Sequence, residues 1–498
     1  MIRTDWTERH ARYTPDAPAL VWGPTGRIYT YADLHEQGEK LAHQLHAQYN
    51  LQPGDRIGIL AENSVEHVQL FIAAQKAGFV LVPLNYRLTA SELQYLVDDS
   101  APSVLFVPDN YADTAQLLDT PAHLLPLEAV ETHIQSVPEN ASAPDESLTL
   151  DDPLMILYTS GTTGRPKGAI ISHGMLFWNA VNTEMRLDLT SADRSFNAAP
   201  FYHTGGWNVL LTPFLLHGAT THLYPDFDAD TLLRDCDAEA FTILWGVPTM
   251  LKLMSDSAVF NEVTLDTVRY AIVGGEAMPE PLIRTWQNKG VPIRQGFGMT
   301  EVGVNCFSLP ARDALRKIGS IGLPNFYIDT KVVDEDGAEV PPNTPGELLM
   351  RGPVVTPGYW QDEDATAEAI DADGWFHTGD LVEVDEEGYF FVVGRKKEMY
   401  ISGGENVYPA EIEAVLHEHD GVAEAAVVGV PDEKWGEVGA AFVSGTQLNA
   451  DSLRTHCKAH LARYKVPKYI EIRDALPKGH SGKIQKSALR EQFSAPAS

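Results

Sequence analysis

Short apolar segments alternate with amphipathic segments along most of the chain, and this alternation constrains the fold more than any other feature. In residues 55–84, DRIGIL, SVEHVQLFIAAQKAG and FVLVPL are typical of a strand, a helix ended by Gly78, and a second strand. The same order recurs in residues 268–296, as VRYAIV, GGEAMPEPLIRTWQNKG and VPIRQG. Upstream, TYADLHEQGEKLAHQL predicts a helix capped by Thr30 and Asp33. Helices that alternate with strands cover parallel sheets, so the pattern predicts an α/β fold with parallel-rich sheets.

The chain is also too long for one hydrophobic core, since it has 498 residues. After about Gly337, DEDGAEVPPNTPGELLMRGP and DEEGYFFVVGRKK predict short antiparallel strands joined by Gly and Pro turns. Further on, PAEIEAVLHEH, VAEAAVVGV and LRTHCKAHLARY predict a helix, a strand and a helix. We therefore predict a large N-terminal domain with a β subdomain over residues 1–396, and a small α+β domain over residues 397–498.

Composition narrows the classes of partner. The 69 acidic residues outnumber the 37 basic ones and give a net charge of −32, which argues against nucleic acid, since duplex binding depends on Lys and Arg. No apolar run approaches the roughly 20 residues of a membrane span, and the N-terminus lacks the apolar core of a secretion signal. The three cysteines, Cys236, Cys306 and Cys457, are far apart and fit neither disulfides nor zinc. We expect a cytoplasmic protein without a membrane span.

The loop YTSGTTGRPKG, residues 158–168, follows the apolar run LMILY and is rich in glycine and hydroxyl groups. Its glycines allow backbone N–H groups to surround an anion, and its hydroxyls add donors. Lys167 adds a point charge suited to phosphate. The loop is not a Walker A motif, because Pro166 stands where that motif has Gly. Taken alone, it is explained equally well as a solvated turn. The candidate anion-binding residues are Thr159, Ser160, Gly161, Thr162, Thr163, Gly164 and Lys167.

Five further motifs follow in order: GGEAMP, QGFGMTE, WFHTGDL, GRKKEMYISGGENVYP and LPKGHSGKIQK. With the loop, they make nearly the whole chain resemble the adenylate-forming superfamily of acyl-CoA synthetases, adenylation domains and luciferases, and above all bacterial fatty-acid or carboxylic-acid CoA ligases. The resemblance implies an enzyme that uses ATP and Mg²⁺ to convert a carboxylic acid into an acyl-adenylate. It then implies transfer of the acyl group to coenzyme A.

The resemblance also implies which residues contact the nucleotide. The loop of residues 159–167 holds phosphate, Thr300 contacts a phosphate oxygen, and Glu301 holds Mg²⁺. Asp380 binds the ribose, and Arg395 reaches ribose or phosphate. The residues implied around adenine are Gly275, Glu276, Ala277, Gly296, Phe297, Gly298 and Met299. The family usually has Tyr in place of Phe297, so stacking is kept and a hydroxyl contact is lost.

In the C-terminal part, the resemblance implies a mobile domain. Lys397 stands at the family's hinge, and Gly403 and Gly404 belong to a loop that lines the thiol's channel after adenylation. Lys483, in the pattern PK-x-x-SGKI, matches the catalytic lysine. A solvated cationic patch at Arg395 and a surface hairpin at the glycines are the alternatives that the residues alone leave open.

The acid is the least defined partner. The segment FYHTGGW carries His203, which resembles a family residue beside the carboxylate, and it lacks the Asp that amino-acid adenylation domains use, so a plain carboxylic acid is favoured. Trp207 either gates an acyl tunnel or belongs to the core. Val247 and Gly303 are small and leave room for an apolar or aromatic tail. We predict a medium- or long-chain fatty acid, with an aryl or other small acid second.

Two other classes of function stay open at this point. One is an enzyme that loads a carrier protein in place of CoA, and the other is a nucleotide-binding regulator without turnover. Nothing in the sequence determines the oligomeric state, and a homodimer is an open alternative.

Overall fold

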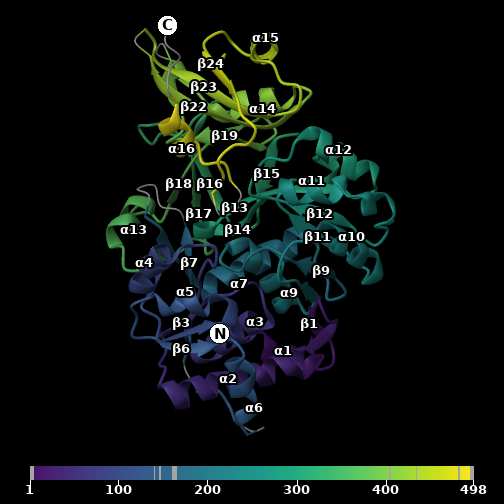
Figure 1. The fold of residues 1–498 in the computed structure, drawn as a ribbon, viewed down its shortest axis with the longest axis vertical. Coiled ribbons are helices and arrows are strands. Elements are labelled where there is room, and N and C mark those ends of the chain that lie inside the picture. The colour runs from purple at the N-terminus through teal and green to yellow at the C-terminus, as the bar shows by residue number, and fades with distance from the viewer. Residues whose placement is uncertain are drawn as a thin grey trace. The chain divides into compact units, whose positions relative to one another are not determined.

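The computed structural model of the protein describes residues 5–138, 141–144, 147–159, 165–402, 405–432, 434–479 and 483–493. The chain forms two compact units, which Figure 1 shows as ribbons. Unit 1 consists of Met1–Thr330 and Met350–Phe376, and unit 2 of Lys331–Leu349 and His377–Ser498. The proposed functional boundary between residues 396 and 397 stays a prediction.

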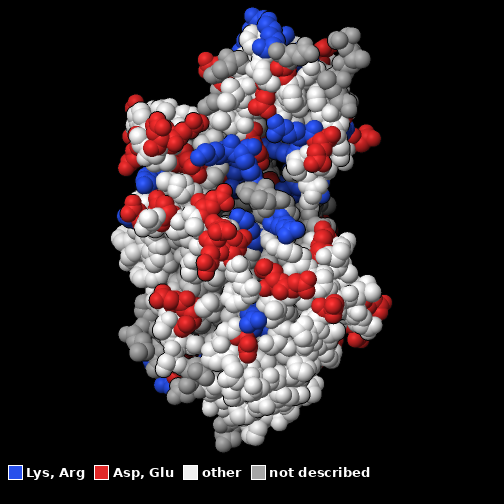
Figure 2. All heavy atoms as spheres, turned by 90° about the vertical axis from the view of Figure 1, so that its left-hand side faces the viewer, with Lys and Arg blue, Asp and Glu red and all other residues white. Residues whose placement is uncertain are grey.

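Figure 2 shows that, on the face it displays, Asp and Glu lie in separate groups and do not form one continuous patch. Among the described residues, no helix combines the length and the apolar character needed to cross a bilayer.

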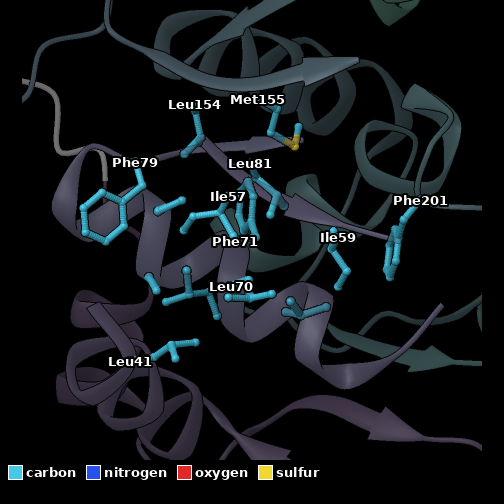
Figure 3. Packing of buried hydrophobic residues seen from close by; sticks show 14 of the residues in the cluster. Leu41, Ile57, Ile59, Leu70, Phe71, Phe79, Leu81, Leu154, Met155 and Phe201 are labelled. Carbon is cyan, nitrogen blue, oxygen red and sulfur yellow. The ribbon is translucent and has the colours of Figure 1, made fainter. Parts of the chain in front are cut away.

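Unit 1 contains a six-stranded sheet. Its strands lie in the order β6-β5-β3-β4-β7-β8 and are parallel except for the antiparallel pair β7–β8. Their bounds are β3 (Arg56–Ile59), β4 (Val80–Pro83), β5 (Val104–Val107), β6 (His123–Pro126), β7 (Pro153–Thr159) and β8 (Lys167–Ser172). Strand side chains such as Ile57, Leu81 and Leu154 pack with Leu70 and Phe71 of α3 (Val65–Ala77) into the core shown in Figure 3.

The helix-start and helix-end signals predicted from the sequence are present in the structure. Helix α2 (Tyr31–Tyr49) begins with a capping box in which the Thr30 hydroxyl accepts from the Asp33 N–H and the Asp33 carboxylate accepts from the Thr30 N–H. Helix α3 ends at Gly78, which takes the left-handed φ of 73° that a side chain would disfavour. The predicted strand–helix–strand unit β3–α3–β4 is therefore confirmed.

The rest of unit 1 repeats this architecture. A second sheet has the order β2-β1-β10-β9, and β11, β12 and β13 are parallel neighbours, with β14 and β15 added antiparallel. The strands are β1 (Pro18–Trp22), β2 (Arg27–Thr30), β9 (Arg194–Asn197), β10 (Thr220–Leu223), β11 (Ile243–Gly246), β12 (Tyr270–Val273), β13 (Ile293–Met299), β14 (Gly303–Ser308) and β15 (Ser320–Pro324). The helices are α1 (Thr7–Tyr13), α4 (Ala90–Ser100), α5 (Ala112–Gln116), α6 (Ala129–Ser136), α7 (His173–Leu187), α8 (Thr204–Asn208), α9 (Leu211–His217), α10 (Ala229–Ala238), α11 (Pro248–Asp256), α12 (Glu280–Asn288) and α13 (Glu363–Ala369).

Unit 2 contains the antiparallel strands and the small α+β segment that the sequence predicts. Its strands are β16 (Asp329–Val333), β17 (Gly346–Arg351), β18 (Phe376–Val384), β19 (Phe390–Arg395), β20 (Tyr400–Ser402), β21 (Glu405–Val407), β22 (Val422–Asp432), β23 (Gly436–Gly445) and β24 (Tyr469–Ile472). Its helices are α14 (Pro409–His417), α15 (Ala450–His460) and α16 (Lys486–Gln492). Helix α15 begins earlier than predicted, because Asn449 caps it by accepting from the N–H groups of Asp451 and Ser452. The predicted fold class is confirmed.

Candidate active site

In unit 1, the structure brings together three predicted phosphate- and metal-site residues. Thr159 ends β7 and lies opposite Lys167 at the start of β8. The Thr159 hydroxyl donates to Glu301 Oε1 at 3.3 Å, and Glu301 belongs to the 3₁₀ turn η3 (Thr300–Val302). Glu301 is only 9% exposed, so a carboxylate at this position requires polar or cationic partners. Ser160 to Gly164, which complete the predicted loop, lie outside the described residues.

Tyr359 joins this group, and the sequence analysis missed it. Its hydroxyl donates to Glu301 Oε1 at 3.1 Å, and Lys167 Nζ lies 5.1 Å from the centre of its ring. Burial, followed by the charge of Glu301, raises the pKa of the Tyr359 phenol. Tyr359 stands 58 positions after Glu301 in the turn TPGYW, so only the folded chain reveals the contact.

The predicted adenine segment is held by strand β13. Gly275 has a φ of 85°, a conformation that favours glycine, and a Cβ there would lie 3.4 Å from Val247. The side chain of Gln295 donates to the carbonyl of Glu276 at 3.0 Å and accepts from the N–H of Met278 at 3.1 Å. These two hydrogen bonds hold the segment from Glu276 to Met278 against β13. Val247 lies beside Gly275. Ala277 is exposed at the surface of the same turn.

The hairpin of β13 and β14 carries the second adenine segment. Phe297 faces Phe307 across the pair, with ring centroids 5.7 Å apart in an edge arrangement. A Cβ on Gly298 would lie 2.4 Å from the carbonyl oxygen of Gly303, so only glycine fits at position 298. Met299 pairs with Gly303 in register. Gly296 lies before these pairs on β13, and half-buried Thr300 follows Met299. The structure therefore places the predicted segment from Gly296 to Thr300 in one hairpin.

Of the four residues predicted to contact the acid, His203 and Trp207 differ in burial. His203 precedes α8, is half-buried, and its ring lies 4.6 Å from that of Tyr202. Trp207 is fully buried, stacks on Phe201 at 4.2 Å, and donates its ring N–H to the Phe201 carbonyl at 2.6 Å. Phe71 of α3 packs on its other side at 5.3 Å. This packing favours the core alternative for Trp207.

Trp207→Ala is expected to lower the free energy of unfolding by about 3–5 kcal/mol, because it removes a large buried ring and leaves a cavity in the core of unit 1. Denaturant unfolding followed by circular dichroism measures this change. Trp435→Ala is the matched control, since Trp435 is 48% exposed and its loss should change stability by about 0.5 kcal/mol or less. A Trp207 variant as stable as that control would place the side chain outside the core.

In unit 2, the two residues predicted to bind ribose, Asp380 and Arg395, form an ion pair. They face each other on β18 and β19, and Arg395 Nε lies 2.7 Å from Asp380 Oδ1. The Asp380 side chain is nearly fully buried, and its other oxygen, Oδ2, has no hydrogen bond with the described residues. Burial raises the pKa of this carboxyl to about 6, against the opposing charges of Arg395 and Lys483. A buried acceptor without a donor fits a ligand hydroxyl, as ribose binding requires.

The predicted catalytic Lys483 is exposed. Its carbonyl accepts from the Gly479 N–H at 2.8 Å. Three residues later, Lys486 binds Glu398 and Glu413, each at 2.8 Å, and thereby connects the start of α16 to the segment after Lys397. Lys397 itself is exposed, and Gly403 and Gly404 lie outside the described residues.

Comparison with known proteins agrees with this geometry. Residues 7–360 match the AMP-binding enzyme family, and residues 411–483 match the AMP-binding enzyme C-terminal domain. The chain belongs to the AMP-binding enzyme family. It is 40% identical to a feruloyl-CoA synthase from an Amycolatopsis species over 98% of both chains, and 36% identical to the long-chain-fatty-acid–CoA ligase FadD13 of Mycobacterium tuberculosis over 99% of both. The solved O-succinylbenzoate CoA synthetase MenE from Bacillus subtilis, in complex with ATP and a magnesium ion, is 30% identical, has a TM-score of 0.86, and matches over 98% of both chains.

These matches confirm the predicted superfamily, the predicted enzyme class and the predicted use of ATP, Mg²⁺ and CoA. The resemblance to the adenylate-forming superfamily holds over the whole chain, and this AMP-binding enzyme is an AMP-forming acyl-CoA synthetase. The relatives carry names for different acids, so they leave its acid substrate undetermined. The roles of individual site residues stay predictions.

Proposed function

We propose that this enzyme activates an aromatic carboxylic acid with ATP and transfers the acyl group to coenzyme A. The observation that supports the nucleotide part is the buried Asp380 carboxylate, because no described residue donates to its Oδ2 and a ribose hydroxyl supplies a donor. Glu301, whose carboxylate is oriented by two hydroxyl groups, fits a magnesium ligand. ATP, Mg²⁺ and CoA are the co-substrates and cofactor of this chemistry.

Each group of residues has a defined task in binding. The loop of residues 159–164 and Lys167 hold the phosphates, and Thr300 contacts a phosphate oxygen. Adenine lies between the Gly275–Ala277 turn and Phe297, and Asp380 and Arg395 hold the ribose. Mg²⁺ on Glu301 neutralises phosphate charge and favours the departure of pyrophosphate.

The first half-reaction joins two anions, so their repulsion is the obstacle. Lys483 donates to the substrate carboxylate and to the α-phosphate, which lowers the repulsion and aligns the attack. A carboxylate oxygen forms a bond to the α-phosphorus, the bond from that phosphorus to the bridging oxygen breaks, and pyrophosphate leaves. His203 lies beside the carboxylate in this arrangement.

The second half-reaction replaces AMP by the thiol. A turn of the C-terminal domain about Lys397 withdraws Lys483 and brings the loop with Gly403 and Gly404 to the acyl-adenylate. The CoA thiol loses its proton and attacks the acyl carbonyl, the carbon–sulfur bond forms, and the bond to AMP breaks. The thioester and AMP are the products.

We place aromatic acids before the fatty acids that the sequence analysis put first, because the packing of Trp207 disfavours a tunnel gate. A tunnel gate must swing, but Trp207 is stacked on Phe201 and donates a hydrogen bond to its carbonyl, so movement would lose both contacts. Gly205 of the same segment lies against Trp245, since a Cβ there would be 3.3 Å from that ring. The ring of Trp245 beside the small residue Gly205 favours an acid with a planar tail. The feruloyl-CoA synthase is also the more similar of the two relatives described above. Medium- and long-chain fatty acids are the alternative.

A screen of acids tests both parts of the proposal. Purified enzyme with ATP, Mg²⁺ and CoA should release pyrophosphate fastest with hydroxycinnamic or other arylalkanoic acids, and the acyl-CoA should form without any carrier protein. Faster release with C8 to C18 fatty acids would contradict the aromatic assignment only. Thioester formation that depends on a carrier protein would contradict the assignment of CoA, and no acid-stimulated ATP–pyrophosphate exchange would contradict the enzyme function itself.

A further inference from the structure

Tyr359 contacts two of the proposed site residues at once. Its hydroxyl donates to Glu301 Oε1 at 3.1 Å, and its ring faces Lys167 Nζ at 5.1 Å. We infer that Tyr359 is a positioning residue, whose hydroxyl orients the carboxylate that holds Mg²⁺ and whose ring holds the ammonium group that faces the phosphates. This inference rests on the proposed function and adds one side chain that couples its metal and phosphate subsites.

The hydroxyl contact fixes the carboxylate. Within the described part of the chain, Thr159 and Tyr359 are the side chains that donate to Glu301, and both reach Oε1. Rotation of the carboxylate would break both bonds at a residue that is only 9% exposed. Oε1 is therefore held by protein donors, and Oε2 is the oxygen left to face Mg²⁺ or its water. Such partners commonly set the orientation of a metal-binding carboxylate.

The ring contact restrains the lysine. A lysine side chain has a long flexible stem, and an ammonium group over the face of a phenol ring is attracted by the ring's electron density. The contact places Lys167 Nζ beside the same ring whose hydroxyl reaches Glu301. Loss of the ring should therefore disturb the phosphate subsite, whereas loss of the hydroxyl alone should disturb the metal subsite.

The backbone on either side of Tyr359 is hydrogen-bonded to the segments that carry Glu301 and Lys167. The Thr356 N–H donates to the Glu301 carbonyl at 2.7 Å. The Trp360 N–H donates to the Gly168 carbonyl at 2.7 Å, one residue after Lys167. The position of Tyr359 is thus fixed by the protein alone.

Two substitutions separate these effects. Tyr359→Phe removes the hydroxyl and keeps the ring, and it should raise the Mg²⁺ concentration that half-saturates ATP–pyrophosphate exchange by about tenfold or more. It should weaken the binding of Mn²⁺ in the presence of ATP by a similar factor, measured by electron paramagnetic resonance. Tyr359→Leu removes the ring as well and should in addition weaken the binding of ATP in EDTA by about threefold or more.

Tyr224→Phe is the matched control. The Tyr224 hydroxyl also donates to a carboxylate, Asp235 Oδ2 at 2.6 Å, and this pair lies outside the proposed site. This variant should leave both metal constants within about twofold of wild type, and thermal unfolding should show that all variants are folded. Metal constants of Tyr359→Phe equal to those of the control would overturn the inference. The Mn²⁺ and ATP binding measurements need no turnover, so a wild-type enzyme without exchange would count against the proposed function and would leave this test intact.

Discussion

Replacement of Lys483 by Ala is expected to slow ATP–pyrophosphate exchange by about 10²–10³-fold, with little change in the rate at which thioester forms from added acyl-AMP and CoA. The reason is that the ammonium group stabilises charge only while the carboxylate attacks the phosphate, and removal of one such preorganised donor has an effect of this order. In the second half-reaction the acyl-adenylate already exists, so the group has no corresponding task. Both half-reactions are measured separately with the acid that the screen identifies.

Lys458→Ala is the control for this experiment. Lys458 lies exposed on α15 of the same unit, so its loss removes one positive charge from the surface only. Both half-reactions of this variant should stay close to wild type. If Lys483→Ala slowed the two half-reactions equally, the division of tasks between adenylation and thioester formation would be wrong, and a general loss of domain structure would be the better account.

The sequence predicted the local elements well where the signal is local. Thr30 and Asp33 form the expected capping box, and Gly78 ends its helix, because both signals depend on neighbours within a few positions. Asp380 and Arg395 were predicted one by one from their motifs, and the pairing of β18 with β19 joins them. The family motifs named each residue, and the strand pairing places their side chains in contact.

Other features depend on contacts between distant segments and could not be read from the sequence. Tyr359 meets Glu301 and Lys167 because its segment pairs antiparallel with β8 at Ala169, and no periodic pattern encodes that pairing. Trp207 could be read as a gate or as core, and the choice depended on Phe71, which lies 136 positions earlier in the chain. Side-chain partners of this kind are a property of the assembled core.

Replacement of Asp380 by Asn is expected to stabilise the ligand-free protein while it damages nucleotide binding. Burial raises the pKa of the carboxyl from 3.8 to about 6, so the folded state binds its proton more tightly than the unfolded chain does. Between these two pH values the folded state holds more protons, and the free energy of unfolding therefore falls as pH rises through this window. At 1.36 kcal/mol per unit, the penalty above pH 7 reaches about 3 kcal/mol.

Asn carries no charge, so Asp380→Asn should raise the free energy of unfolding by up to about 3 kcal/mol at pH 8, and the gain should shrink below pH 6 and vanish below about pH 4. Urea unfolding at several pH values measures it. Asp329→Asn is the control, because Asp329 is exposed and paired with Arg351, and its effect should stay within about 0.5 kcal/mol. A variant that is less stable than wild type at pH 8 would show that the ion pair with Arg395 outweighs the burial of the charge.

The same substitution should weaken ATP binding by about 10- to 100-fold, because a hydroxyl bound to a buried carboxylate contributes about 1.5–3 kcal/mol. Wild-type affinity for ATP should rise as pH increases through about 6, since only the ionised carboxylate offers Oδ2 as a full acceptor, whereas the affinity of Asp380→Asn should not follow this titration. Titration calorimetry with ATP between pH 5 and pH 8 gives both curves. Wild-type affinity that stays flat across pH 6 would mean that the carboxyl does not titrate in the ligand-free site. Stability lost and affinity gained over the same pH interval would instead show that the folded chain bears the strain of a buried charge in order to bind the ribose.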